Sequence, residues 1–231
     1  MQALQKNNRA ADAVALLNTL RKEQALSANV LADLDIQLHA SAIEQSSHAD
    51  ACLHQWHSLP DRLRNNTTIL KTFAMRADAL GLETKAVQVL SDHLSQYWTP
   101  ELLDSLAAIS THANDQRLGL CEAWLPQHPD DAALHAALGK LYGQDKNYPE
   151  AEAMLQRSVS LDACTDAWES LGNIYSAQQK NEQASTAYAN ALRLQREQLP
   201  LLLTGQSLRE QIASQAVADI RNEHGFPVLP K

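Results

Sequence analysis

The chain has 231 residues, with 19 Lys and Arg against 27 Asp and Glu, which gives a formal net charge of −8 at pH 7. Alanine and leucine dominate with 36 each, whereas glycine (7), proline (8) and aromatic residues (5%) are scarce. Strands need β-branched and aromatic residues with Gly-rich turns between them, so this composition excludes a sheet protein and predicts an all-α fold. The acidic balance argues against nucleic acid and against an anionic membrane surface as partners.

The first half of the chain is expected to form helices separated by turn residues. Apolar residues at helical spacing, interrupted by proline or glycine, mark the expected elements in chain order. These elements are a helix around Ala13, Leu17 and Leu20, a pair at residues 30–44 and 49–59 ended by Pro60, a pair around Gly81 (Leu70, Phe73 and Ala77 before it, Ala86 and Leu90 after it), and a pair at residues 100–110 and 115–127.

Two segments further along, residues 131–161 and 165–195, repeat each other at a spacing of 33 residues. The second copy reads W-x2-L-G-x2-Y, followed by A-x3-Y. This pattern resembles the tetratricopeptide repeat (TPR). The matched positions are His135 and Trp168, Leu138 and Leu171, Gly139 and Gly172, Tyr142 and Tyr175, Ala151 and Ala184, Leu155 and Tyr188, and Ser158 and Ala191.

The residue types at these positions have a physical reason. Small residues such as Gly139 and Gly172 let two antiparallel helices approach closely, and large ones such as Trp168 fill the space to the next repeat. One repeat cannot bury its apolar face alone, so repeats stack. The sequence predicts a single TPR superhelix over residues 1–223 with eleven to twelve antiparallel helices. A helix at residues 207–223 is expected to cover the last repeat, and residues 224–231 to be a disordered tail.

Four segments resemble a narrower family, over residues 49–195. They are residues 55–60 (QWHSLP), 98–102 (WTPEL), 124–131 (WLPQHPDD) and 138–142 (LGKLY), and their order and spacing are similar to the C-terminal TPR half of the bacterial HemY family. The resemblance implies a link to late protoheme synthesis, with heme-biosynthesis enzymes as partners.

The HemY resemblance also implies a location on the cytoplasmic face of the inner membrane. Members of the family carry two N-terminal membrane helices, which this chain lacks. The chain is therefore expected to be an excised domain or a truncated relative. We expect no membrane contact by this segment itself, because it has no run of about 20 apolar residues.

The densest cluster of potential ligands contains His54 and His57. Residues three apart share a helix face, so two imidazoles at this spacing could hold a metal or supply an axial ligand to heme iron. A structural zinc site would need four ligands at short spacings, which the sequence does not offer. Exposed histidines beside a packed Trp56 are the preferred interpretation, with no metal and no cofactor. Direct binding of heme or a porphyrin is the alternative.

No catalytic motif is visible, so we expect no enzyme activity, and an enzyme of the late heme pathway is the least favoured of the alternatives. The sequence contains no nucleophile elbow, no Gly-rich phosphate loop and no paired metal-ligand motif. Asp130 or Asp131 is interpreted as the N-cap of the helix beginning near Ala132. The odd number of cysteines, without a CxxC pair, predicts reduced, buried thiols at Cys52, Cys121 and Cys164.

The concave face is the default binding surface of a TPR solenoid, and it is lined by outward positions of each repeat's first helix. TPRs that clamp a C-terminal carboxylate carry Lys and Asn one turn apart there. Here Asn173 matches, but Glu169 replaces the Lys, which disfavours such a clamp. The sequence predicts a non-catalytic groove for a protein or peptide partner. Its residues are Ala133, Ala136, Lys140, Gln144, Asp166, Glu169, Asn173 and Ala177.

Overall fold

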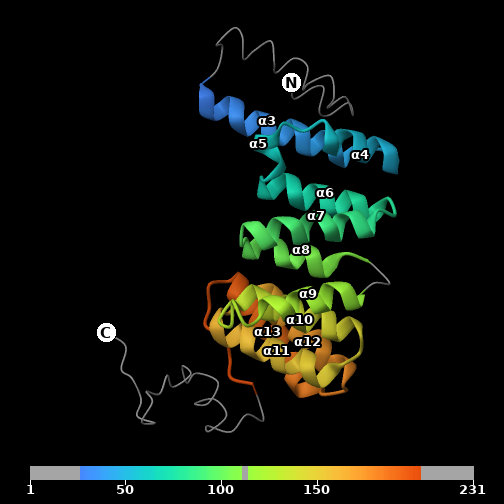
Figure 1. Cartoon of the computed structure of the whole chain (residues 1–231). Helices are drawn as coiled ribbons and strands as arrows, with labels where there is room; N and C mark the ends of the chain where they lie inside the picture. Colours follow the sequence, from blue (N-terminus) through green and yellow to red (C-terminus); the bar gives the residue numbers. More distant parts are fainter. Residues whose placement is uncertain (1–26, 111–113, 204–231) are drawn as a thin grey trace, which may run out of the picture. The chain divides into compact units, whose positions relative to one another are not determined.

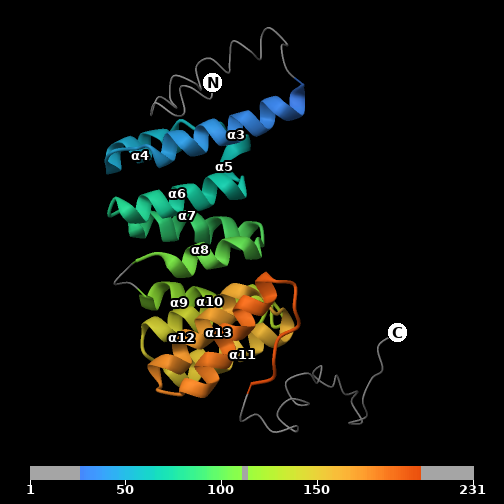
Figure 2. The same cartoon turned by 180° about the vertical axis from the view of Figure 1, so that it is seen from behind.

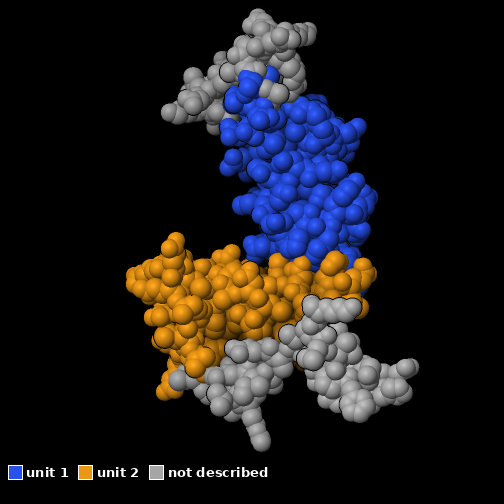
Figure 3. Space-filling view, turned by 90° about the vertical axis from the view of Figure 1, so that its left-hand side faces the viewer, with its two compact units in different colours: residues 1–124 blue, residues 125–231 orange. Residues whose placement is uncertain are grey.

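The computed structural model describes residues 27–110 and 114–203, and Figure 1 shows the order of their helices. Eleven α-helices and one 3-10 helix, and no strand, are present among these residues, which confirms the predicted all-α TPR-like fold. The chain divides into two compact units, residues 1–124 and 125–231 (Figure 3), and each is described by itself. The single solenoid over residues 1–223 stays a prediction. The helix around Ala13, the helix at 207–223 and the tail at 224–231 lie outside the described residues.

The helices of unit 1 fall close to the ranges expected from apolar spacing. One short helix, α5, was not predicted, and the segment expected at 100–110 divides into η1 and α8. In order they are α3 (Ala28–Glu44), α4 (Ala49–His57), α5 (Asp61–Arg64), α6 (Thr67–Ala79), α7 (Glu83–Gln96), η1 (Pro100–Leu102), α8 (Leu103–Ala108) and α9 (Asn114–Trp124).

Local signals fix the helix ends of unit 1. The Asn66 side chain caps α6 by accepting hydrogen bonds from the backbone N–H groups of Thr68 and Ile69. His48 caps α4 in the same way. Between α6 and α7, Gly81 has φ +75, a conformation that side chains disfavour. Trp56 stacks on Phe73 at a centroid distance of 4.3 Å, which joins α4 to α6 through the core.

Among the described residues of unit 1, Arg117 of α9 has the largest fully buried side chain, and it closes the end of α8. Only 1% of it is exposed. Its Nη1 donates to the backbone oxygens of Leu106 at 3.2 Å, Ala107 at 2.8 Å and Ile109 at 2.6 Å. The last carbonyls of a helix have no partner within the helix, so a cation there supplies both hydrogen bonds and a favourable charge.

The described residues of unit 2 form two helical hairpins, α10 (Ala132–Gln144) with α11 (Tyr148–Leu161) and α12 (Thr165–Ala177) with α13 (Asn181–Gln195). These match the two predicted repeats. Asp131 is the N-cap of α10, because its Oδ1 accepts from the Leu134 N–H at 3.0 Å. Asp130 instead binds Arg157 at 2.7 Å. Trp168 is buried, as expected of the repeat's packing residue.

The two repeat glycines bring paired helices together. A Cβ on Gly139 would lie 2.5 Å from Cγ of Leu155, and a Cβ on Gly172 would lie 2.6 Å from Cε1 of Tyr188. Real Cβ atoms essentially never come so close, so no side chain fits without a shift. His135, at the position of the repeat's tryptophan, is buried and pairs through Nε2 with the Pro129 carbonyl at 2.8 Å.

The turns within both hairpins place a non-glycine residue in the left-handed region. Lys146 has φ 62 and Gln179 has φ 61, at equivalent positions after α10 and α12. The following N–H groups bond back to the carbonyls of Tyr142 and Tyr175, which completes a Schellman-type helix end. Glycine is the usual residue at such a position because it carries no Cβ.

Replacing Lys146 or Gln179 by glycine should therefore stabilise the protein. The left-handed conformation costs a side chain about 1–2 kcal/mol, and the extra freedom of glycine in the unfolded chain offsets part of that gain. We expect the free energy of unfolding to rise by about 0.5–1 kcal/mol for each change, measured by urea titration. The matched control is Gly81→Ala, which should lose about 1 kcal/mol. Destabilisation by both glycine variants would contradict this account of the turns.

The cysteines are only partly as expected. Cys52 and Cys121 are buried, and burial raises the pKa of both thiols, that of Cys121 to about 12. Both are therefore poor nucleophiles at neutral pH. The prediction was wrong for Cys164, which is exposed because it precedes the first turn of α12 instead of facing the core.

Candidate functional site

The predicted groove residues form one stripe on the first helix of each hairpin in unit 2. On α12, Asp166, Glu169, Asn173 and Ala177 are spaced along one face, and all four are exposed. The opposite face of α12 carries the buried core. On α10 the stripe is less open. Gln144 is exposed there, and the half-buried members are Ala133, Ala136 and Lys140.

The α12 stripe carries two carboxylates and an amide. The Tyr188 hydroxyl donates to Oδ1 of Asn173 at 2.7 Å, which orients the amide. The amide nitrogen of Asn173 is then the group that can donate to a ligand. Asp166 and Glu169 present negative charge within the same two helical turns. This arrangement repels a C-terminal carboxylate and suits a partner segment with basic or hydrogen-bond-donating groups.

A polar network that joins α11 to the second hairpin was not predicted from the sequence. Glu152 of α11 accepts from Lys180 at 2.7 Å and from Gln178 at 3.1 Å. Gln156, one turn further along α11, donates to the Tyr175 hydroxyl at 2.9 Å. Burial raises the pKa of Tyr175 to about 12, so the phenol stays protonated. The four-residue spacing of Glu152 and Gln156 places both side chains on one face of α11, which the sequence could have shown. The sequence near them does not indicate which residues they bind.

His54 and His57 both lie near the end of α4 and are exposed. Neither of them lines a described pocket, and the described ranges contain no group of three or more His, Cys, Asp or Glu side chains that could hold a metal ion. A heme or porphyrin site buries most of its ligand among apolar side chains. The surroundings of these histidines do not fit a heme, so we assign them no ligand.

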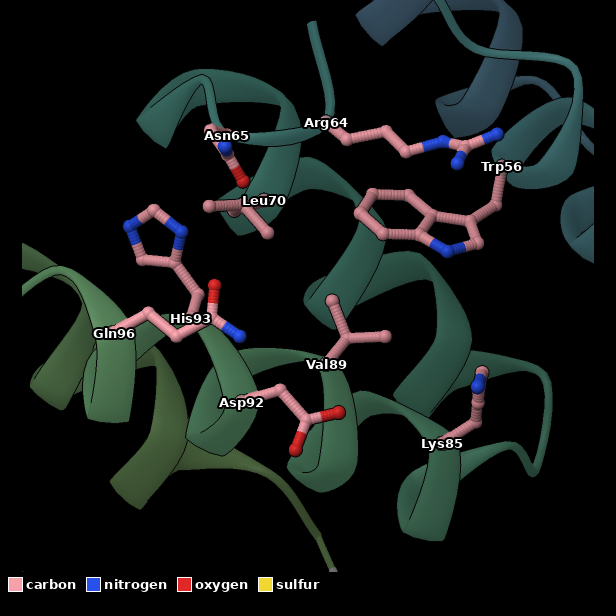
Figure 4. A pocket seen from close by; sticks show the side chains of 9 residues that line it. All are labelled: Trp56, Arg64, Asn65, Leu70, Lys85, Val89, Asp92, His93 and Gln96. Carbon is pink, nitrogen blue, oxygen red and sulfur yellow. The ribbon is translucent and has the colours of Figure 1, made fainter. Parts of the chain in front are cut away.

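The cleft described in unit 1 lies beside α7 and has room for about 270 Å³ (Figure 4). Its walls mix basic, acidic, amide and apolar side chains from α4, α5, α6, α7 and the turn after α5. The lining residues are Trp56, Arg64, Asn65, Leu70, Lys85, Val89, Asp92, His93 and Gln96. Trp56 was expected to be packed, but the cleft itself was not predicted from the sequence.

His93 is the buried titratable group of this cleft. Its Nε2 lies 3.2 Å from the Thr99 hydroxyl, which itself donates to the Tyr97 carbonyl. The hydroxyl has a single hydrogen, so Nε2 must be the donor to Thr99. Burial lowers the pKa of His93, which keeps the ring neutral at pH 7. Nδ1 is then an acceptor, and it has no hydrogen-bond partner among the described residues.

Comparison with known proteins identifies the second hairpin. Residues 165–198 match the tetratricopeptide repeat family, over α12 and α13. The chain contains a TPR domain. The match covers the second of the two predicted copies, the one that contains Trp168. No curated protein matches the chain.

Solved structures similar to this chain include three of MamA. MamA 41-end from Desulfovibrio magneticus RS-1 is 18% identical, with a TM-score of 0.45, and the match covers 71% of this chain and 96% of that one. An ArsTM double mutant of MamA from RS-1 is also 18% identical, with a TM-score of 0.45 and coverage of 70% and 92%. MamA from AMB-1 is 12% identical, with a TM-score of 0.43 and coverage of 69% and 96%.

Within the two described ranges, no helix is both long and apolar enough to cross a bilayer.

Proposed function

We propose that this TPR domain binds a segment of a partner protein along α10 and α12. The observation that carries the proposal is the exposed stripe of Asp166, Glu169, Asn173 and Ala177, which extends over the whole length of α12. A rigid helix supports these side chains, because its other face is packed into the core of unit 2. Residues held in this way lose little freedom when a partner binds.

The chemistry of the stripe favours a basic partner segment. Asp166 and Glu169 supply negative charge, and Asn173 supplies an oriented amide. Ala133, Ala136 and Ala177 carry short side chains, which leave room for a helix or an extended peptide to approach the backbone. Lys140 on α10 is the one cation of the predicted groove and would pair with an acidic residue of the partner.

Charge reversal tests this proposal. Glu169→Lys and Lys140→Glu should each weaken the binding of a genuine groove partner by about tenfold or more, because each places like charge opposite the partner. Partner proteins are first captured on the immobilised chain. The affinity of each captured protein for the wild-type chain and for each variant is then measured by surface plasmon resonance. The matched control is Glu182→Lys, an exposed carboxylate of α13 outside the stripe. Unchanged affinity in both groove variants would place the partner site elsewhere.

We further propose that the partners are enzymes of late protoheme synthesis, at the cytoplasmic face of a bacterial inner membrane. The support is the order and spacing of residues 55–60, 98–102, 124–131 and 138–142, which are similar to the HemY family. Cross-linking of the chain in cells, followed by identification of the linked proteins, tests this proposal. We expect heme-biosynthesis enzymes to be linked to the wild-type chain and depleted with Glu169→Lys. Recovery of unrelated proteins alone would refute the assignment to heme synthesis but would not contradict the proposed binding groove.

A further inference from the structure

An extended segment follows α13 and runs back beside it. Residues 199–203, called the strap below, have no helical structure and continue from the end of α13 in the direction opposite to that of the helix (Figure 2). Residues 201–203 are three consecutive leucines that follow Pro200. In the structure the strap is an extended peptide of the chain itself, bound to the surface of α13.

The buried side chain of Asn190 binds the strap through its backbone. Asn190 is 0% exposed. Its Nδ2 donates to the carbonyl of Leu201 at 2.8 Å, and its Oδ1 accepts from the N–H of the same residue. Arg193, one turn further along α13, donates through Nε to the Leu199 carbonyl at 2.7 Å. These three bonds recognise an extended backbone and do not depend on which side chains the peptide carries.

Leu203 is the apolar anchor of the strap. It is 7% exposed and belongs to the core cluster that contains Ala184, Ala187 and Ala191 of α13. In a longer TPR array the first helix of the following repeat would pack on α13. The strap therefore lies on a surface that normally accepts a further packed element.

Most of the strap's own apolar side chains stay exposed to solvent. Leu199 is 83% exposed and Leu202 is 72% exposed, and Leu201 is also exposed. The turn that leads into the strap places Glu197 at φ 58, in the left-handed region that non-glycine residues disfavour. A peptide with the same backbone contacts, but without this turn and with more of its apolar surface buried, would bind better than the strap does.

We propose that Asn190, Arg193 and the apolar pocket filled by Leu203 form a binding site, the strap seat, for an extended peptide of another protein. The partner peptide carries a leucine or similar apolar residue two positions after the residue that pairs with Asn190. The strap occupies the seat as an internal competitor. The seat shares no residue with the stripe on α12, so the failure of one site leaves the other untouched.

The test is peptide binding to the 231-residue chain with the strap released. The probe is a capped, fluorescein-labelled peptide of residues 198–203, Gln-Leu-Pro-Leu-Leu-Leu. Leu203→Asp removes the anchor of the strap, and Leu202→Asp places the same charge on its exposed neighbour. In the wild type the strap competes with the peptide, and because it is tethered to the seat it acts at an effective concentration in the millimolar range. Fluorescence anisotropy should therefore show at least tenfold tighter binding to Leu203→Asp than to the wild type or to Leu202→Asp.

Further variants identify the site of binding. Adding Asn190→Ala to Leu203→Asp should abolish the gain, and so should replacing the last leucine of the peptide by aspartate. Glu169→Lys should leave peptide binding unchanged. If Leu203→Asp does not fold by circular dichroism, Leu203→Ala replaces it. Equal affinity of a folded strap-released variant and the wild type overturns the proposal.

The competing occupant is the strap of a second copy of this chain. Analytical ultracentrifugation tests for this occupant. Exchange of straps between copies would make the wild type dimerise with rising concentration, and the Leu203→Asp variant would not dimerise. A wild-type chain that stays monomeric supports the assignment to another protein. A dimer with this behaviour overturns it.

Discussion

Replacing Arg117 by alanine should cost about 3–5 kcal/mol of the free energy of unfolding, the largest effect expected for a single change in unit 1. The substitution leaves the carbonyls of Leu106, Ala107 and Ile109 without the donor that serves all three. A buried acceptor without a partner costs about 1–3 kcal/mol, and the deleted side chain also leaves a cavity. Urea unfolding followed by circular dichroism measures the loss.

The control for Arg117→Ala is Arg196→Ala, which removes the same side chain from an exposed position after α13. A change there should stay within about 0.5 kcal/mol of the wild type. Arg117→Lys adds a second comparison, because lysine keeps the charge but does not reproduce the shape of the guanidinium. A loss below about 1 kcal/mol for Arg117→Ala would mean that water or a neighbouring group replaces the guanidinium at the end of α8.

A methyl group on Gly139 should destabilise unit 2 by about 1–3 kcal/mol, although alanine is the better helix former. The new Cβ would lie 2.5 Å from Cγ of Leu155 and 3.1 Å from the Ala151 carbonyl oxygen. The first contact is with a branch point and the second with backbone. Neither can move without shifting α11 away from α10, so the strain outweighs the helix propensity.

Gly119→Ala is the matched control for Gly139→Ala. Gly119 also lies inside a helix, but a Cβ there has nothing within 4 Å. Alanine should therefore gain up to about 1 kcal/mol at Gly119, so the two variants are expected to change stability in opposite directions. If both variants are stabilised, the two helices of the first hairpin are not held at the separation described.

The sequence predicted the helical hairpins well because their determinants are local. Gly139 and Gly172 occur at a fixed spacing from Ala151 and Ala184, and each reports on a helix pair close by in the chain. Pro60 and Asp131 mark the starts of α5 and α10, where each accepts a hydrogen bond from a backbone N–H three residues further along the chain. The exposed residues of the α12 stripe could be predicted for the same reason, because helical spacing alone indicates which side of a helix faces away from the core.

The missed features depend on partners that no spacing specifies. Arg117 looks like an ordinary helical arginine until the end of α8 is placed beside it. Asn190 reads as a surface amide at a helix position, yet it is fully buried because the strap folds back over it. Cys164 was expected in the core, but the N-cap position it occupies points it outward. In each case the deciding contact is tertiary, and apolar periodicity carries no information about it.

The network around Glu152 also bears on how unit 2 unfolds. Glu152 and Gln156 belong to the first hairpin, whereas Tyr175, Gln178 and Lys180 belong to the second. In repeat proteins, total stability is close to a sum of terms for each repeat and for each boundary between neighbours. A boundary that carries an ion pair and two further, partly buried hydrogen bonds has a stronger neighbour term than one held by apolar contacts alone. Neither hairpin can then open without exposing these groups on the other, so the two should melt in a single cooperative transition.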